Sequence, residues 1–215
     1  MPSKFDKIIV VDVESTCYDR GTEPKDFVSE IIEVGVCLLD VTTLERSDKR
    51  GIYVKPTRSV VSPFCTNLTG ITQETVDQGV PLEEACKILM RDYLSKARVW
   101  ASYGDYDRRM FTDNCAMLGI KYPFGAAHQN VRTRLTTDMG LVDRPPLDDA
   151  VRVIGRTFEG RHHSGADDAW NIAAVLGRMM AWSRNGKALE SSMGKRVEQF
   201  LAGVANPQQP DGGGA

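Results

Sequence analysis

The sequence lacks the features that mark a secreted or membrane-bound protein. No uninterrupted apolar run approaches the roughly 18 residues that a membrane-spanning helix needs, and the first residues, MPSKFDK, contain no apolar signal segment. The five cysteines are scattered, odd in number and without a CxxC pair, which disfavours a disulfide framework and a zinc site. We therefore expect a cytoplasmic protein that has no membrane partner.

An excess of positive charge is also missing. The 27 Lys and Arg residues are outnumbered by 29 Asp and Glu residues, which leaves a net charge of −2. A broad basic surface for nucleic acid is therefore not indicated, and any contact with phosphate must be local or made through a metal ion. The length and an apolar content of 41% predict one domain at residues 1–204, followed by a disordered, Pro- and Gly-rich tail at 205–215.

Residues 7–18, KIIVVDVESTCY, organise the rest of the chain. Their β-branched side chains predict a strand, and the alternation of side chains along it places Asp12 and Glu14 on one face. Because both faces are apolar where it starts, the strand is expected to be central and buried. The acid pair then lies at the edge of the sheet where open α/β folds bind ligands. It needs a cation or another partner there, unless both side chains simply point into solvent.

Further elements follow from the hydrophobic pattern. Residues 29–40, 51–56 and 97–102 are predicted strands, with a polar connector at 42–50. Short connections between the first three strands indicate an antiparallel meander. Helices are predicted at 72–79, 81–94, 105–118, 132–140, 147–155, 166–180 and 191–203.

Helical periodicity separates two pairs of neighbouring aspartates. Asp107 is in phase with the apolar residues that follow it, whereas Asp105 is expected to cap the same helix from outside the buried stripe. In the last core helix, Asp168 is in phase with the apolar stripe and Asp167 is not. One aspartate of each pair is therefore expected to face the core.

Four acids are thus expected to point inward from the ends of different elements, namely Asp12, Glu14, Asp107 and Asp168. Four carboxylates cannot share a site without a cation, because each negative charge raises the pKa of the others. Ligands that are all oxygens favour Mg²⁺ or Mn²⁺ over zinc. Two such ions about 3.5–4 Å apart form a site that hydrolyses phosphodiesters, in which one ion activates water and the other stabilises the leaving oxygen.

The chain has three histidines, and two of them, His162 and His163, stand shortly before Asp168. A pair of histidines in a loop is more often a solvated surface feature. Beside an activated water, however, an imidazole is a candidate general base, because its pKa lies near neutrality.

The chain resembles the DEDDh 3′–5′ exonucleases in three segments, DVES, YGDYDRRMF and HHSGADDAWNIA. The family's histidine stands five positions before its last aspartate, a spacing that fits His163 with Asp168 and also His162 with Asp167. Because helical phase turns Asp168 inward, His163 is the expected base and His162 is not. The likeness extends over residues 5–182 and is strongest to the small RNA-trimming members, judged by LTGIT and SGADDAWNIA. It implies an α/β, RNase H-like fold with a mixed five-stranded sheet flanked by helices.

The resemblance implies catalytic roles for the four acids and one histidine. In the family pattern, Asp12 bridges two metal ions, and Glu14 and Asp168 complete the ligands of the first. Asp107 holds the second ion, partly through water. His163 deprotonates the water that attacks the terminal phosphodiester, so that a nucleoside 5′-monophosphate is released. The expected cofactors are therefore two Mg²⁺ or Mn²⁺ ions.

The resemblance also implies a pocket for the terminal nucleotide. The residues expected to contact its sugar and base, or to wedge against it, are Val13, Ser15, Thr16, Leu68 and Ile71. An ordinary core position is an equally good account of Leu68. Arg156 and Arg161 are candidates to contact the incoming backbone, although a solvated loop is the simpler account of either.

The expected partner is single-stranded nucleic acid with a free 3′ end, with RNA favoured over DNA. A DNA proofreading or repair exonuclease with the same site is the alternative enzyme. A third reading is a nucleic-acid-binding module on a degenerate nuclease scaffold. It is disfavoured because such proteins usually lack catalytic acids, and here all five catalytic positions are filled.

Overall fold

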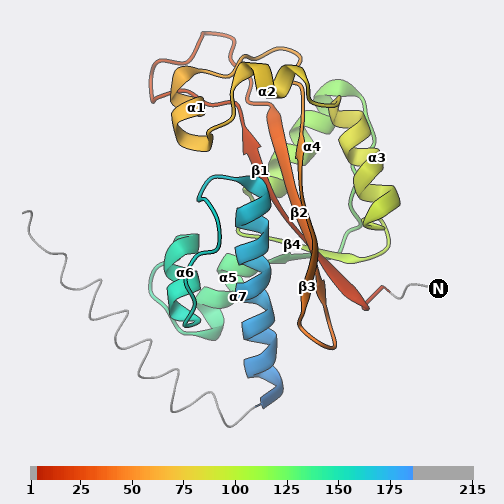
Figure 1. Ribbon diagram of the computed structural model, residues 1–215, viewed down its shortest axis with the longest axis vertical. Coiled ribbons are helices and arrows are strands. Elements are labelled where there is room, and N and C mark those ends of the chain that lie inside the picture. The colour runs from red at the N-terminus through yellow and green to blue at the C-terminus, as the bar shows by residue number, and fades with distance from the viewer. Residues whose placement is uncertain (1–3, 186–215) are drawn as a thin grey trace, which may run out of the picture.

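The computed structural model describes residues 4–185, which form a five-stranded sheet with helices on both faces (Figure 1). In spatial order, the strands are β3 (Arg46–Tyr53), β2 (Ile31–Asp40), β1 (Lys7–Ser15), β4 (Val99–Ser102) and β5 (His128–Asn130). β1, β2 and β3 pair antiparallel, as the predicted meander requires, whereas β4 is parallel to β1 and to β5. The sheet is therefore mixed with β1 at its centre, which confirms the predicted fold.

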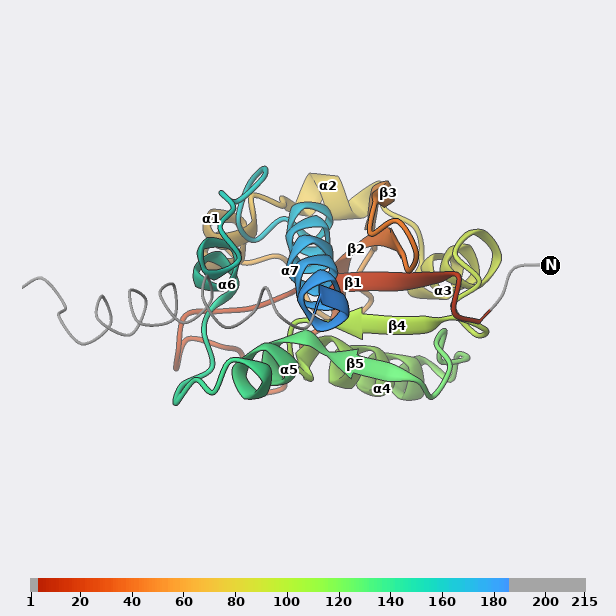
Figure 2. The same ribbon diagram turned by 90° about the horizontal axis from the view of Figure 1, so that it is seen from below.

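Alternating side chains of β1 contribute to two separate apolar cores. Ile8 and Val10 pack with α7 (Gly165–Asn185) and the helices of residues 131–153 on one face, and Ile9 and Val11 pack with the helices of residues 82–118 on the other. Figure 2 looks nearly along α7, which lies against β1 and β2. The helices are α1 (Pro63–Thr69), α2 (Gln73–Asp77), α3 (Leu82–Asp92), α4 (Tyr106–Leu118), α5 (Val131–Asp138), α6 (Leu147–Val153) and α7 (Gly165–Asn185). Within residues 4–185, none of them is both long and apolar enough to cross a membrane.

The third strand starts earlier than the sequence pattern predicts. Residues 46–50, expected within a polar connector, belong to β3, where Asp48, Lys49 and Arg50 are exposed. β3 lies at the edge of the sheet. An edge strand can carry charged side chains, because its outer edge and one face meet solvent. The hydrophobic pattern therefore located only the end of this strand that contributes to the core.

Two short elements, α1 and β5, were not predicted. α1 follows Ser62, whose side chain accepts a hydrogen bond from the backbone of Cys65, and it is closed by Gly70 at a φ of 70°. β5 has three half-buried residues, which are too few for a hydrophobic pattern. The helix predicted at 191–203, the tail at 205–215 and the domain boundary at 204 lie outside the described residues.

A glycine on β2 lets α7 approach the sheet closely. A Cβ on Gly35 would lie 1.8 Å from the backbone carbon of Gly165, so the contact requires glycine. Two residues earlier, the buried carboxylate of Glu33 accepts hydrogen bonds from the backbone nitrogens of Gly165 at 3.0 Å and Ala166 at 3.3 Å. In the pairing of β1 with β2, Gly35 lies opposite Asp12 and Glu33 lies opposite Glu14. The start of α7, and with it Asp168, is thereby held over those acids.

Candidate active site

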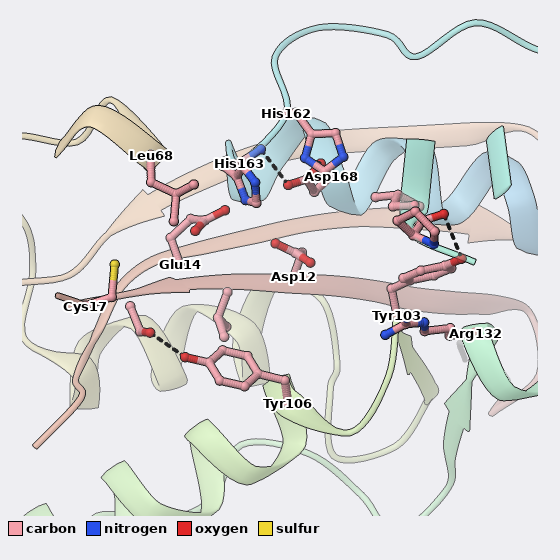
Figure 3. A pocket seen from close by; sticks show the side chains of 14 residues that line it. Asp12, Glu14, Cys17, Leu68, Tyr103, Tyr106, Arg132, His162, His163 and Asp168 are labelled. Carbon is pink, nitrogen blue, oxygen red and sulfur yellow. Dashed lines mark hydrogen bonds and ion pairs between the residues drawn. The ribbon is translucent and has the colours of Figure 1, made fainter. Parts of the chain in front are cut away.

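Three carboxylates converge where β1 ends and α7 begins (Figure 3). Asp12 and Glu14 come from β1 and Asp168 from the first turn of α7, and each offers an oxygen within 4.8 Å of those of the other two. They line a cavity of about 380 Å³ that also receives His162 and His163. Residues more than 150 positions apart in the chain thus form one compact group of charge-bearing side chains.

Asp107 enters the same region from the first turn of α4. Its side chain is buried, and its Oδ1 accepts a hydrogen bond from the backbone N–H of Val13 at 2.9 Å. This bond attaches α4 to β1 between the two acids of that strand. Among the described residues, Asp107 is a neighbour of the group of three close carboxylates and not a member of it.

Burial raises the pKa of every acid in this site, and repulsion by neighbouring site acids adds to it for Asp12, Glu14 and Asp168. Burial, together with the charge of Asp168, raises the pKa of Glu14 to about 8. Burial raises the pKa of Asp168 to about 7. Burial also raises the pKa of Asp107 to about 6, although the hydrogen bond from Val13 acts to lower it. The pKa of Asp12 rises well above its ordinary value through burial and the charges of Asp107 and Asp168.

A divalent cation fits this set of donors. Asp168 Oδ1 is buried and has no hydrogen-bond partner, an arrangement that costs free energy unless another group compensates it. Within the group formed by Asp12, Glu14 and Asp168, the donors are all carboxylate oxygens, which suit the hard cations Mg²⁺ and Mn²⁺ better than zinc. A cation among Asp12, Glu14 and Asp168 would both neutralise their repulsion and fill the missing interaction of Asp168.

We expect the metal-free protein to lose stability as the pH rises from about 4 to about 8. The acids have a higher pKa in the folded than in the unfolded chain, so the unfolded chain releases its protons first and gains stability over that window. Because a cation binds ionised carboxylates, Mn²⁺ should raise the melting temperature more at about pH 8 than at about pH 6. Thermal unfolding with Mn²⁺ or EDTA measures both effects, and an equal Mn²⁺ effect at the two pH values contradicts the expectation.

The two histidines contact different parts of the acid cluster (Figure 3). The backbone N–H of His163 donates to Asp168 Oδ2 at 3.0 Å, and its ring lies beside Glu14. The ring of His162 stacks on Phe158 with centroids 4.9 Å apart, and its Nδ1 lies 3.9 Å from Asp168 Oδ1. Both rings line the cavity, so the choice between them still depends on the motif spacing and on chemistry.

His163 has the properties of a proton acceptor. Partial burial lowers its pKa, and the neighbouring His162 and Arg161 lower it further. The ring is therefore neutral near neutral pH, which is the form that a general base needs. Its backbone is left-handed, with a φ of 59°, a conformation that costs a non-glycine residue free energy and is found disproportionately at functional sites.

The structure brings three of the five predicted substrate-binding residues to the cavity. Val13, Ser15 and Leu68 line it, and Leu68 is 38% exposed, so it is not a core residue. Thr16 is fully buried and Ile71 nearly so, and neither lines the cavity. The Thr16 hydroxyl instead bonds to the loop that precedes α1, and Ile71 belongs to a small apolar cluster under that helix.

Three further residues from the sequence analysis lie outside the cavity wall. Arg161 donates to the backbone carbonyl of Leu68 at 3.3 Å, and Arg156 forms an ion pair within its own loop. Asp105 occupies the N-cap position of α4 but makes no capping hydrogen bond. The expected position is therefore confirmed, but the carboxylate pairs with the side chain of Arg108 and does not cap the helix.

The cavity wall also contains residues that the sequence analysis did not name. Tyr106 directly precedes the motif aspartate of α4, and its hydroxyl lies 2.6 Å from that of Ser15, so the motif position could have indicated it. Tyr103 and Arg132 line the opposite end of the cavity (Figure 3). They follow β4 and β5, and no local sequence pattern marks them.

The fold and the acid cluster together are those of a known class of nuclease. The model of the exonuclease family matches residues 9–176, and the chain belongs to this family. Human 3′-5′ exoribonuclease 1 is 32% identical over 189 residues, which cover 83% of this chain and 53% of that protein. The 3′-5′ exonuclease Snipper of Drosophila melanogaster is 29% identical, over 82% of this chain and 70% of its own length. The chain thus spans about half the length of the human relative.

Solved structures agree with this assignment. The nuclease domain of 3′hExo, a DEDDh family member bound to rAMP, superposes with a TM-score of 0.74 at 32% identity, covering 84% of this chain and 94% of that one. Cell-death related nuclease 4 has a TM-score of 0.69 at 22% identity, over 83% of this chain and 65% of its own, and supports the fold alone. The predicted family and its RNase H-like fold are therefore confirmed.

Proposed function

We propose that this protein is a divalent-cation-dependent 3′–5′ exonuclease that releases nucleoside 5′-monophosphates from single-stranded nucleic acid ends. The observation that carries the proposal is the convergence of Asp12, Glu14 and Asp168, whose oxygens lie within 4.8 Å of one another beside two histidines. Buried carboxylates in such a group repel one another unless a cation lies between them. The proposed cofactors are two Mg²⁺ or Mn²⁺ ions.

The chain's own residues would hold the ions and move one proton. Asp12, Glu14 and Asp168 would bind one ion, and Asp107 with Asp12 would bind the other. When bound, such ions lower the pKa of the attacking water and neutralise charge on the leaving oxygen. His163 accepts the proton of that water. The bond between phosphorus and O3′ then breaks, which leaves a 3′ hydroxyl on the shortened strand and the phosphate on the released nucleotide.

The terminal nucleotide is proposed to lie between the end of β1 and α1. Val13 and Ser15 would contact its sugar, and the exposed side chain of Leu68 would pack against its base. Thr16 and Ile71 would support this wall from behind, as their burial favours. The hydroxyls of Ser15 and Tyr106, which form a hydrogen bond with each other, would form the floor of the pocket.

RNA is the proposed substrate, because similar proteins act on RNA or are seen bound to it. The human relative is an exoribonuclease, and structures of 3′-exonucleases contain rAMP or a histone mRNA stem-loop. A DNA exonuclease with the same site is the second candidate, because the acid cluster is proposed to act on the phosphodiester, which RNA and DNA share, and not on the 2′ hydroxyl that distinguishes them. A cytoplasmic location also stays a prediction.

A nuclease assay on 5′-labelled single-stranded RNA and DNA of matched sequence tests the proposal. With Mg²⁺ or Mn²⁺, we expect stepwise shortening from the 3′ end, 5′-monophosphate products and faster loss of RNA, and no reaction with EDTA. Internal cuts or EDTA-resistant cleavage argue against the proposed mechanism. Faster hydrolysis of DNA defeats only the RNA preference, and binding without any hydrolysis supports the non-catalytic module.

A further inference from the structure

The cavity extends beyond the pocket proposed for the terminal nucleotide. In Figure 3, Leu68 and Tyr106 lie on one side of Asp12, whereas Tyr103 and Arg132 lie on the other. Hydrolysis of a terminal phosphodiester requires one nucleotide on each side of the scissile phosphate. Because that phosphate meets the acid cluster, the end of the cavity that contains Tyr103 and Arg132 faces the strand that is retained.

Arg132 is held in a fixed position at this end. Its Nε donates to the backbone carbonyl of Pro145 at 3.0 Å, and its Nη2 donates to that of Arg144 at 2.8 Å. Tyr103 donates to the same Pro145 carbonyl at 2.9 Å, and the guanidinium carbon lies 5.9 Å from the centre of the tyrosine ring. A guanidinium has five N–H donors, so these two bonds leave donors available for an anion. The side chain is therefore ordered before any ligand binds.

The charge of Arg132 is unusual for its surroundings. Among the residues that the structure describes, it is the single lysine or arginine that lines this cavity. The protein carries a net charge of −2, so a phosphate contact has to be local. A guanidinium binds phosphate through two directed hydrogen bonds, and an adjacent aromatic ring offers a surface for a sugar or a base. Arg132 and Tyr103 together supply both features.

We propose that Arg132, tethered to the backbone of residues 144–145 and flanked by Tyr103, binds the phosphate on the 5′ side of the penultimate nucleotide. The inference rests on the proposed exonuclease function and adds a second phosphate site to it. Contacts to phosphate carry no sequence information, so this subsite would set the register of the strand without selecting its bases. A substrate that has this second phosphate should therefore react faster than one that lacks it.

Two adenosine dinucleotides provide the test. ApA contains only the scissile phosphate, whereas pApA also has a phosphate on the 5′ side of the penultimate nucleoside. The same bond breaks in both, so the ratio of their kcat/KM values reports the second phosphate alone. With Mn²⁺, we expect the unchanged protein to prefer pApA by about 10- to 100-fold, the range for a hydrogen bond to a charged group. In Arg132→Ala, the ratio should fall to about 1.

A second arginine of α5 serves as the matched control. Arg134 bonds to Asp138 and Gln129 and does not line the cavity, so Arg134→Ala should retain the preference for pApA. Arg132→Gln keeps a long hydrogen-bonding side chain without the charge, and it should also lose the preference. This variant carries the test if the alanine variant does not fold.

The ratio separates the proposal from other roles of Arg132. A role confined to holding residues 144–145, or a contact with the scissile phosphate itself, lowers both rates by the same factor and leaves the ratio unchanged. An unchanged ratio in the Arg132 variants overturns the inference, as does a ratio near 1 in the unchanged protein. If the unchanged protein hydrolyses neither dinucleotide nor longer RNA, the proposed function fails. Hydrolysis of both dinucleotides at equal rates defeats only the second phosphate site.

Discussion

Asparagine in place of Asp12 is expected to abolish hydrolysis while the protein remains folded. Oxygens of Asp12 lie within 4.8 Å of oxygens of both Glu14 and Asp168, and the charge of Asp107 also acts on it. The amide has nearly the same shape as the carboxylate but no charge, so a bound cation would lose one of the carboxylate ligands proposed for it. We expect kcat on single-stranded RNA to fall by at least about 1000-fold.

The same substitution should make the metal-free protein more stable. It removes one negative charge from a group whose members raise one another's pKa, so the melting temperature in EDTA should rise. The further increase that Mn²⁺ produces should become smaller. Asp105→Asn is the matched control, because Asp105 is exposed and pairs with Arg108 outside the cavity, and it should retain activity. Substantial turnover by Asp12→Asn would place the chemistry elsewhere in the molecule.

Alanine in place of His163 is expected to lower kcat by about 100- to 10,000-fold, the usual contribution of a general base. The lowered pKa of this histidine keeps the ring neutral, and its ring lies beside the acid cluster. The loss should appear in kcat with little change in KM, because His163 is proposed to move a proton and not to hold the nucleotide. Single-turnover hydrolysis of labelled RNA with saturating Mn²⁺ measures the chemical step directly.

His162→Ala is the informative comparison for this prediction. His162 also lines the cavity, and its Nδ1 lies 3.9 Å from Asp168 Oδ1, so proximity to the acids does not decide between the two rings. The ring of His162 is engaged by stacking on Phe158, which favours a supporting role. We expect a smaller loss for His162→Ala than for His163→Ala. The opposite order would make His162 the base and the motif spacing misleading.

Most of the acid cluster could be predicted because side-chain direction is a local property. Helical phase separated Asp107, which is buried, from Asp105, which is exposed. It also separated Asp168, which is buried, from Asp167, which is half-buried. A strand with two apolar faces was expected at the centre of the sheet, and β1 is there. In each case a few neighbouring residues contain the signal, because the periods of helices and strands are set by the backbone.

Other features could not be predicted because they depend on position within the whole fold. The start of β3 carries exposed charges that only an edge strand tolerates, and β5 is three residues long. Thr16 lies between two cavity residues in sequence and Ile71 lies three positions after another, but both turn into the protein. Arg132 reaches the cavity because residues 144–145 hold its guanidinium, a contact without any counterpart in the local sequence.

By itself, the sequence determined which acids face inward, which histidine has the motif spacing and which family the chain resembles. The tertiary structure alone decided how far apart these groups lie. Gly35 admits the start of α7 against β2, and Glu33 binds the first backbone nitrogens of that helix, so Asp168 meets Asp12 and Glu14 within 4.8 Å. The backbone sets the direction of a side chain within a few residues, whereas the distance between two elements depends on packing between segments far apart in the chain.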